Sequence, residues 1–198
     1  VQPFCKVVIV AMALSVFMSC GKSSQEEADE TFSIHRGTNI SHWLSQSRRR
    51  GDERKNFFQE KDVQYIAGLG FDHIRIPIDE EQLWAQSGEK EAEAFALLHN
   101  ALDWSQKAGL KVVVDLHILR SHHFNESDKP LWTDPAAQER FFQCWRDLSG
   151  ELQKYPVSMV AYELMNEPVA DDPEDWNRLV AKALEVIRSK EPLRKIVI

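Results

Sequence analysis

The sequence predicts an α/β fold with a parallel sheet, of the (β/α)8 or TIM barrel type. From residue 31 onward, short runs rich in β-branched residues alternate with longer stretches whose apolar residues recur at helical spacing. In addition, Asn166-Glu167-Pro168 directly follows an apolar run at residues 160–165, and barrels of this type keep their functional groups at the carboxyl ends of strands. The pattern contains four complete βα units and the start of a fifth. We therefore expect a barrel truncated after about its first four units.

The first part of this pattern comprises two strands and two helices. The strands are expected over residues 32–39 and 72–78, and the helices over 61–69 and 91–108. Both helices carry apolar residues at helical spacing. Each is followed by a glycine, Gly70 or Gly109, and glycine readily adopts the left-handed conformation that ends many helices.

The second part begins with the clearest strand of the chain. Residues 110–117 contain three successive valines, which suit a strand buried on both faces of a parallel sheet. A helix is expected over residues 135–154, with Asp134 as its N-cap and Pro135 at its first position. A strand over 157–165, a helix over 175–190 and the opening of a fifth strand at 195–198 complete the pattern.

Composition limits the classes of function. A hydrophobic fraction of 43% and a charged fraction of 28% describe an ordinary globular chain. The net charge of -7 argues against a nucleic-acid partner, because binding the phosphate backbone needs a clustered basic surface. The one basic run, at residues 48–50, is interpreted as a solvated loop. Cys144 lies in an amphipathic helical stretch and is interpreted as a buried structural thiol, so no disulfide is expected.

The N-terminus resembles a bacterial lipoprotein signal. Residues 1–20 carry an apolar run that has the length of a secretory signal and is shorter than a membrane span. Ser19-Cys20-Gly21 resembles a lipobox, in which the cysteine is lipidated. Residues 21–31 would then form a polar, acidic tether, and 32–198 the folded domain. The other interpretation is a plain cleaved signal with an incidental cysteine. We expect an exported protein, lipid-anchored at the cell envelope or otherwise secreted, that contacts the membrane only through such an anchor.

Polar residues gather at the expected carboxyl ends of the strands. If all strands point the same way, one rim collects the residues Asn39, Trp43, Arg75, His117, Asn166 and Glu167. Charged side chains at the ends of apolar strands are unfavourable unless they are solvated or paired. Their succession on four strands therefore predicts a polar pocket at this rim.

These residues resemble the first half of a glycoside hydrolase of family 5, the cellulase family. The resemblance rests on Arg75 in Ile74-Arg75-Ile76-Pro77, on His117 in Asp115-Leu116-His117, on Asn166-Glu167-Pro168, and on the opening segment at residues 36–44. It covers residues 32–198 and implies the N-terminal half of a (β/α)8 catalytic domain.

The resemblance also implies roles for individual residues. Glu167 would be the general acid/base, and Asn166 would bind the sugar 2-hydroxyl beside the scissile bond. Arg75 would hold the nucleophilic carboxylate, and His117 would line the subsite where the bond is cut. Asn39 and Trp43 are further substrate-binding candidates. The family's nucleophile, a glutamate at the end of the seventh strand, would lie beyond Ile198.

Each assignment has a structural alternative. Glu167 could be a carboxylate at a helix entry, favoured by the helix dipole. Arg75 could pair with a rim carboxylate such as Asp115. His117 could be a core histidine held by a backbone carbonyl, and Asn39 a structural hydrogen-bonding residue in the first loop.

The aromatic residues and the remaining histidines are also candidates for the rim. Trp43, Trp84 and Trp132 could form platforms that stack on sugar rings, whereas the tryptophans expected on helices are interpreted as packing residues: Trp104, Trp145 and Trp176. His122-His123 does not predict a metal site, because adjacent residues of an extended segment point to opposite sides.

The function expected from the resemblance is retaining hydrolysis of a β-linked polysaccharide, with glucan of the cellulose type as the first choice. The partner is thus a polysaccharide or oligosaccharide, and neither a cofactor nor a metal is expected. The rival hypotheses are a non-catalytic glycan-binding surface lipoprotein and an inactive truncated fragment.

Overall fold

The computed structural model describes residues 31–198. The predicted signal peptide at 1–20, the lipidation at Cys20 and nearly all of the tether at 21–31 lie outside these residues. No helix within 31–198 is both long enough and apolar enough to cross a membrane.

The described chain is built around a parallel sheet with its strands in sequence order, β1-β2-β3-β4-β5. The strands are β1 (Gly37–Asn39), β2 (His73–Asp79), β3 (Lys111–Ile118), β4 (Val160–Glu163) and β5 (Ile196–Val197). In this register Thr38, Ile74, Val112 and Val160 lie side by side across four strands. A strand that always pairs with the preceding one, after a helical crossover, is the pattern of βα units. The predicted α/β fold is confirmed.

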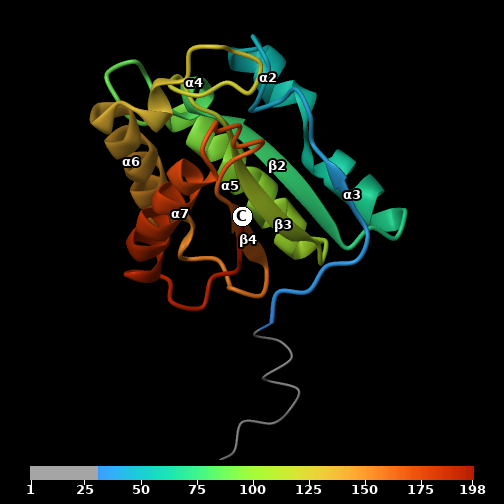
Figure 1. Ribbon diagram of the computed structural model, residues 1–198. Helices are drawn as coiled ribbons and strands as arrows, with labels where there is room; N and C mark the ends of the chain where they lie inside the picture. The colour runs from blue at the N-terminus through green and yellow to red at the C-terminus, as the bar shows by residue number, and fades with distance from the viewer. Residues whose placement is uncertain (1–30) are drawn as a thin grey trace, which may run out of the picture.

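Helices connect the strands. They are α2 (Gly51–Phe57), α3 (Glu60–Gly68), α4 (Glu80–Leu83), α5 (Ala92–Lys107), α6 (Pro135–Leu152) and α7 (Pro173–Arg188), with a 3-10 turn η1 at Pro130–Trp132. Helices α6 and α7 pack against each other, and α3 packs beside α5. Figure 1 shows α6 and α7 toward the left of the view and α3 toward the right, with α2 and α4 at the end of the molecule where β2 and β3 finish.

The helix boundaries follow from side-chain caps. Asp134 accepts a hydrogen bond from the Ala136 amide at the start of α6, and Pro135 occupies the first helical position, as predicted. Asp172 and Pro173 repeat the arrangement at α7. Helices α3 and α5 are followed by Gly70 and Gly109, whose φ angles are +79° and +73°, so the predicted glycine stops are confirmed.

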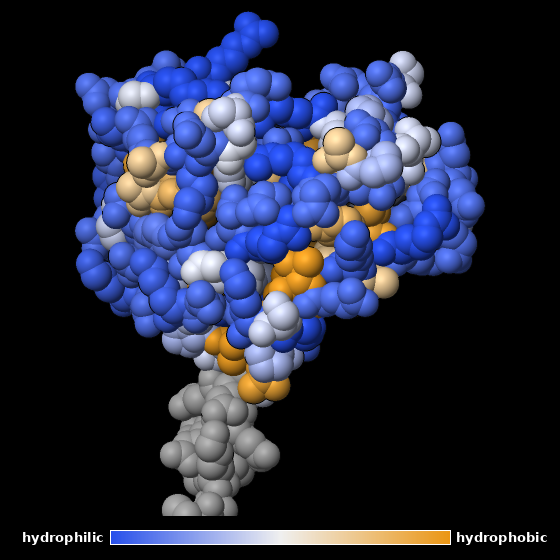
Figure 2. Space-filling view, turned by 90° about the vertical axis from the view of Figure 1, so that its left-hand side faces the viewer, coloured by the Kyte–Doolittle hydropathy of each residue, from blue (hydrophilic) through white to orange (hydrophobic). Residues whose placement is uncertain are grey.

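The core lies between the sheet and the helices. Helix α7 buries Leu179, Val180, Ala183 and Ile187, which fall on one face of a helix. From α6, Trp145 packs against Tyr162 of β4, with ring centroids 5.5 Å apart. Cys144 is buried, as predicted, and its burial raises the pKa of the thiol far above the ordinary range. The outer surface on the α6 and α7 side is mostly hydrophilic, with separate apolar patches (Figure 2).

One buried arginine ties several elements together at the amino end of β4. Arg194 is 1% exposed, and its guanidinium binds the Glu191 carboxylate and the carbonyls of Tyr155, Pro156 and Val160 at 2.7–2.9 Å. Glu191 in turn accepts from Tyr162 Oη and from Ser149. The carbonyls just beyond the end of α6 are thereby satisfied by a cation, which also suits the helix dipole.

The structure corrects several expected boundaries. The first strand is three residues long rather than spanning 32–39, and β4 ends at Glu163 rather than at Met165. Two short helices, α2 and α4, were not predicted. Helix α2 is polar on most of its surface and buries Arg54 alone, so it lacks the apolar periodicity that would have indicated a helix.

Candidate active site

The candidate site lies at the carboxyl ends of β1 to β4, where the sequence placed it. Arg75, on β2, is the centre of this rim. Its Nε and Nη2 donate to the two carboxylate oxygens of Glu163, both at 2.7 Å, in the bidentate geometry that Arg and a carboxylate favour. The guanidinium also lies 2.8 Å from Asp115. The structural alternative considered for Arg75, pairing with Asp115, is therefore realised, with Glu163 as a second partner.

Arg75 also orients two asparagines. Its Nη1 donates to Asn39 Oδ1, and its Nη2 to Asn166 Oδ1, both at 3.1 Å. The Asn39 amide nitrogen donates to Ser41 Oγ at 2.7 Å, so both ends of that side chain are engaged within the protein. Because Asn166 Oδ1 faces the guanidinium, its amide nitrogen is left as the donor for a ligand.

Asp115 joins this network to His117. The carboxylate is wholly buried, and its Oδ2 lies 2.6 Å from His117 Nδ1. Burial raises the pKa of Asp115 to about 6, with the nearby Glu163 acting in the same direction, while the His117 hydrogen bond and Arg75 oppose the shift. Burial also acts to lower the pKa of Arg75, but the hydrogen bonds that it donates to Glu163 and the charge of Asp115 outweigh it and leave the pKa raised.

His117 is held on both ring nitrogens. Nδ1 faces Asp115, so it carries the proton, and Nε2 lies 3.3 Å from the amide nitrogen of Gln46. The Phe124 ring contacts His117 edge-on at 6.3 Å between centroids. The alternative for His117, a core histidine held by a backbone carbonyl, is not what the structure shows, because its partners are the side chains of Asp115 and Gln46.

The turn after β1 brings Gln46 to this position through strained backbone. His42 and Gln46 have φ angles of +58° and +48°, which non-glycine residues adopt only where the surroundings enforce them. The backbone N–H of Gln46 donates to Asp79 Oδ2 at 2.5 Å. Asp79 is buried, and burial raises its pKa despite that hydrogen bond. The turn is thus fixed by a carboxylate at the end of β2.

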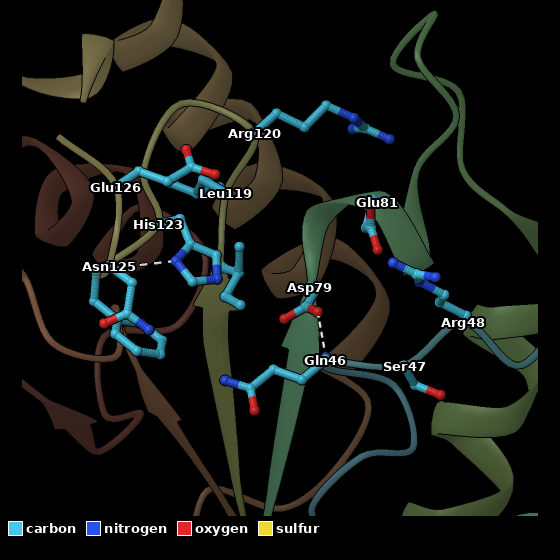
Figure 3. Close-up of a pocket in the computed structure, with 12 residues that line it drawn as sticks. Gln46, Ser47, Arg48, Asp79, Glu81, Leu119, Arg120, His123, Asn125 and Glu126 are labelled. Atoms are coloured by element: carbon cyan, nitrogen blue, oxygen red, sulfur yellow. Dashed lines mark hydrogen bonds between the residues drawn. The ribbon is translucent and has the colours of Figure 1, made fainter. Parts of the chain in front are cut away.

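A pocket of about 570 Å³ opens beside His117, between the turn after β1 and the loop after β3. Figure 3 shows Gln46 and Asp79 on one side of it and His123 and Asn125 on the other. Its lining mixes polar groups with the apolar surfaces of Ile118, Leu119 and Phe124. This combination of hydroxyl-binding groups and an aromatic ring is suited to a sugar.

Glu167 lies at the edge of the network with an unusual backbone. Its φ angle is +47° and the residue is exposed. Its carbonyl accepts from the Val169 amide at 2.7 Å and lies 3.1 Å from His122 Nε2. The adjacent Asn166 is the residue held by Arg75, so the Asn-Glu pair is connected to the rim through Asn166.

Two of the aromatic predictions are wrong. Trp43 is 0% exposed, contacts Phe58, and donates its indole N–H to the Arg54 carbonyl at 2.9 Å. Trp84 is also wholly buried. Neither presents a face on which a sugar could stack. Trp132 is partly buried, and its indole N–H is bound to the Val169 carbonyl. The three helical tryptophans pack in or against the core, as predicted: Trp104, Trp145 and Trp176.

Sequence reasoning missed three residues of the site: Glu163, Gln46 and His122. Glu163 had a usable signal, because a carboxylate inside an apolar strand requires a partner. Gln46 and His122 had none, since each is brought in by a loop whose path depends on the fold. Within residues 31–198, no group of three or more His, Cys, Asp or Glu side chains is arranged to hold a metal ion.

Comparison with known proteins agrees with this geometry. The family model for cellulase, glycosyl hydrolase family 5, matches residues 29–198. The chain is 31% identical over 170 residues to endoglucanase C of Acetivibrio thermocellus, with 84% of this chain and 49% of that protein covered. It is 29% identical to cellodextrinase A of Ruminococcus flavefaciens, covering 80% of this chain and 48% of that protein. The chain thus spans about half the length of these relatives.

A solved structure shows the same fold. Thermotoga maritima Cel5A, crystallised in complex with mannotriose, matches with a TM-score of 0.67 and 27% identity, over 86% of this chain and 52% of that one. A second structure of the same enzyme, with cellobiose, matches equally well. The five strands described above therefore correspond to about half of a TIM barrel, as the sequence predicted.

Proposed function

The chain belongs to glycosyl hydrolase family 5, and from that membership we propose that it carries the acid/base half of the active site of a β-glucan hydrolase. The observation that supports this proposal most directly is the placement of Asn166-Glu167 beside the network of Arg75, Asp115 and His117. Asn166 is held with its amide nitrogen available, and the exposed Glu167 follows it. The endoglucanase and cellodextrinase relatives favour β-glucan as the substrate class.

The proposed mechanism is retaining double displacement. In the first step the Glu167 carboxyl gives its proton to the glycosidic oxygen while the bond from that oxygen to the anomeric carbon breaks. A second carboxylate, about 5 Å away, forms a bond to the same carbon. In the second step Glu167, now ionised, takes a proton from water, and the water oxygen displaces the second carboxylate. The five described strands supply the first carboxyl group, and the family resemblance places the second on the seventh strand.

Each rim residue then has a defined part. Asn166 donates to a sugar hydroxyl next to the scissile bond, and Arg75 fixes the asparagine in that orientation. His117 offers an imidazole locked by Asp115 and Gln46. The pocket of Figure 3 is lined in part by Gln46 and Phe124, which both contact His117, and we assign it to a sugar unit beside the one that is cleaved.

The test is replacement of Glu167 by Gln in the complete barrel that contains this chain. On cello-oligosaccharides kcat/KM should fall by about 10²- to 10⁴-fold, because the leaving sugar then departs without a proton. On 2,4-dinitrophenyl β-cellobioside, whose leaving group needs no proton, kcat/KM should persist. Glu139→Gln is the matched control, since Glu139 lies on the outer helix α6 and pairs with Arg146. Unchanged hydrolysis of cello-oligosaccharides by Glu167→Gln would exclude the assignment.

We also propose that the protein is exported and anchored by lipid at Cys20. The support is the signal-like composition of residues 1–20 and the lipobox-like Ser19-Cys20-Gly21. An extracytoplasmic position gives the enzyme access to polysaccharides, which are too large to enter a cell.

A further inference from the structure

Two aromatic side chains from one loop hold the backbone around Glu167. The loop joins β3 to α6 and contains His122 and Trp132. His122 Nε2 lies 3.1 Å from the Glu167 carbonyl, and Trp132 Nε1 donates to the Val169 carbonyl at 3.0 Å. The two rings also contact each other edge-on, with centroids 5.1 Å apart. The segment after β4 is therefore attached to the neighbouring loop at two points, two residues apart.

The backbone held in this way is strained. Glu167 has φ +47°, and a non-glycine residue keeps this left-handed conformation only where its surroundings impose it. The Glu167 carbonyl also accepts from the Val169 amide at 2.7 Å, which closes a tight turn over Pro168. Since φ determines where the side chain leaves the backbone, the bonds that maintain this φ also set the direction of the Cα–Cβ bond of Glu167.

His122 is built to act as a donor. The residue is 1% exposed, and within the described chain its Nδ1 is buried without a hydrogen-bond partner. Its backbone is fixed by a pair of hydrogen bonds with Leu119, each 3.1 Å long. Burial lowers the pKa of His122, against the opposing effect of the Glu167 carbonyl. The ring is thus the neutral Nε2–H tautomer, because only that form donates to the carbonyl without burying a second N–H.

We propose that His122 is a positioning residue for Glu167, assisted by Trp132: its N–H holds the carbonyl of the acid/base and thereby aims the carboxyl group at the glycosidic oxygen. This inference rests on the proposed function of Glu167. It assigns a role in proton delivery to a residue that does not touch the substrate. Loss of the N–H should therefore impair the steps that need the proton and spare those that do not.

The experiment compares two substrates in the complete barrel. Cello-oligosaccharides need protonation of the leaving group, whereas 2,4-dinitrophenyl β-cellobioside does not, so the ratio of their kcat/KM values reports how well the acid is placed. The ratio is unaffected by any misfolded fraction, because inactive protein lowers both values equally. For His122→Phe we expect kcat/KM to fall about tenfold or more on the oligosaccharide and by less than about twofold on the aryl glycoside.

Conservative variants and a remote control sharpen the test. His122→Gln should restore the ratio to within about threefold of wild type, because the glutamine amide can donate to the same carbonyl. His122→Asn, one methylene shorter, should not. His99→Gln is the control: like His122, His99 lies beside an aromatic ring, here Tyr155, but it is only partly buried and lies on the outer helix α5. We expect it to leave the ratio unchanged.

The outcomes separate this inference from the proposed function. If wild type cleaves both substrates and His122→Phe either lowers the two kcat/KM values equally or leaves both unchanged, the positioning role is overturned while the function of Glu167 stands. If Gln and Asn at position 122 give the same ratio, the N–H donor is not the operative group and the proposal is also overturned. If wild type cleaves neither substrate, the proposed function fails, and the inference fails with it.

Discussion

Among the single residues of the site, Asp115 has the least favourable surroundings for a charge. It is wholly buried, and it shares the Arg75 guanidinium with a second carboxylate, Glu163. One of its oxygens, Oδ1, is buried without a hydrogen-bond partner in the described chain. Such a group is stable only because the cation and His117 partly compensate for the lost hydration.

This gives a prediction on pH. The carboxyl has an ordinary pKa of 3.8 and a folded pKa of about 6, so the folded state binds the proton more tightly than the unfolded state does. The contribution of the protonated Asp115 carboxyl to the free energy of unfolding is fully present below about pH 4 and is lost as the pH rises through about 6. The free energy of unfolding of wild type minus that of Asp115→Asn should therefore fall by about 2 kcal/mol between pH 4 and 6. Urea unfolding across this range measures it.

The control is Asp128→Asn. This makes the same substitution at an exposed position, on the loop before η1. If the difference for Asp115→Asn did not change between pH 4 and 6, Asp115 would be ionised normally in the folded protein.

Whether the sequence could predict a site residue depended on whether that residue lies in or near a strand or in a loop. Arg75 and His117 lie within strands and Asn166 only three residues beyond one, so the parallel topology alone brings them together. Trp43 was misplaced because a tryptophan in a rim loop can turn inward, and here its N–H found a carbonyl of the following helix. Gln46 and His122 act through loop conformations with strained or tightly turned backbone, which local pattern does not encode.

At the scale of the elements, the helices and strands with strong periodicity were predictable and the connections were not. Helix α6 began at Pro135 as expected because its cap, Asp134, is local. The short helices α2 and α4 form because tertiary contacts support them: Arg54 of α2 is buried against Gln82 of α4, with Nη1 3.1 Å from its amide oxygen. Such contacts join residues far apart in sequence, and no window of sequence contains them.

Substitution of Arg194 is the strongest test of how the elements are held together. Replacing it with Met removes the cation that binds Glu191 and the carbonyls beyond α6, and it leaves the Glu191 carboxylate buried and unpaired. We expect a loss of about 3–5 kcal/mol in the free energy of unfolding, measured by urea denaturation at pH 7. The control is Arg178→Met, which removes an exposed ion pair with Asp175 on α7 and should change stability by less than about 0.5 kcal/mol. Equal effects of the two substitutions would contradict the structural role of Arg194.

At the scale of the whole molecule, the proposed anchor determines where the enzyme acts. Replacing Cys20 with Ser removes the thiol to which a lipid would be attached while leaving the apolar run of the signal unchanged. We expect the protein to move from the membrane fraction to the soluble extracytoplasmic fraction, and incorporation of labelled fatty acid to disappear. Hydrolysis of soluble oligosaccharide by the complete barrel should be unaffected, because Cys20 lies outside the described residues that form the proposed site. A Cys20→Ser protein that stays in the membrane fraction would show that the anchor is not lipid at this residue.

The order of the strands along the sheet has a consequence for biosynthesis. Each strand pairs with the one made just before it, so its partner has already left the ribosome when it emerges. At about 5–20 residues per second, a unit of about 40 residues takes seconds to synthesise, whereas helices and turns form within microseconds. Each new unit therefore finds the strand with which it pairs already present. The carboxylate partners of Arg75, Asp115 and Glu163, are made 40 and 88 residues after it, so its set of ion pairs is complete only when β4 is added.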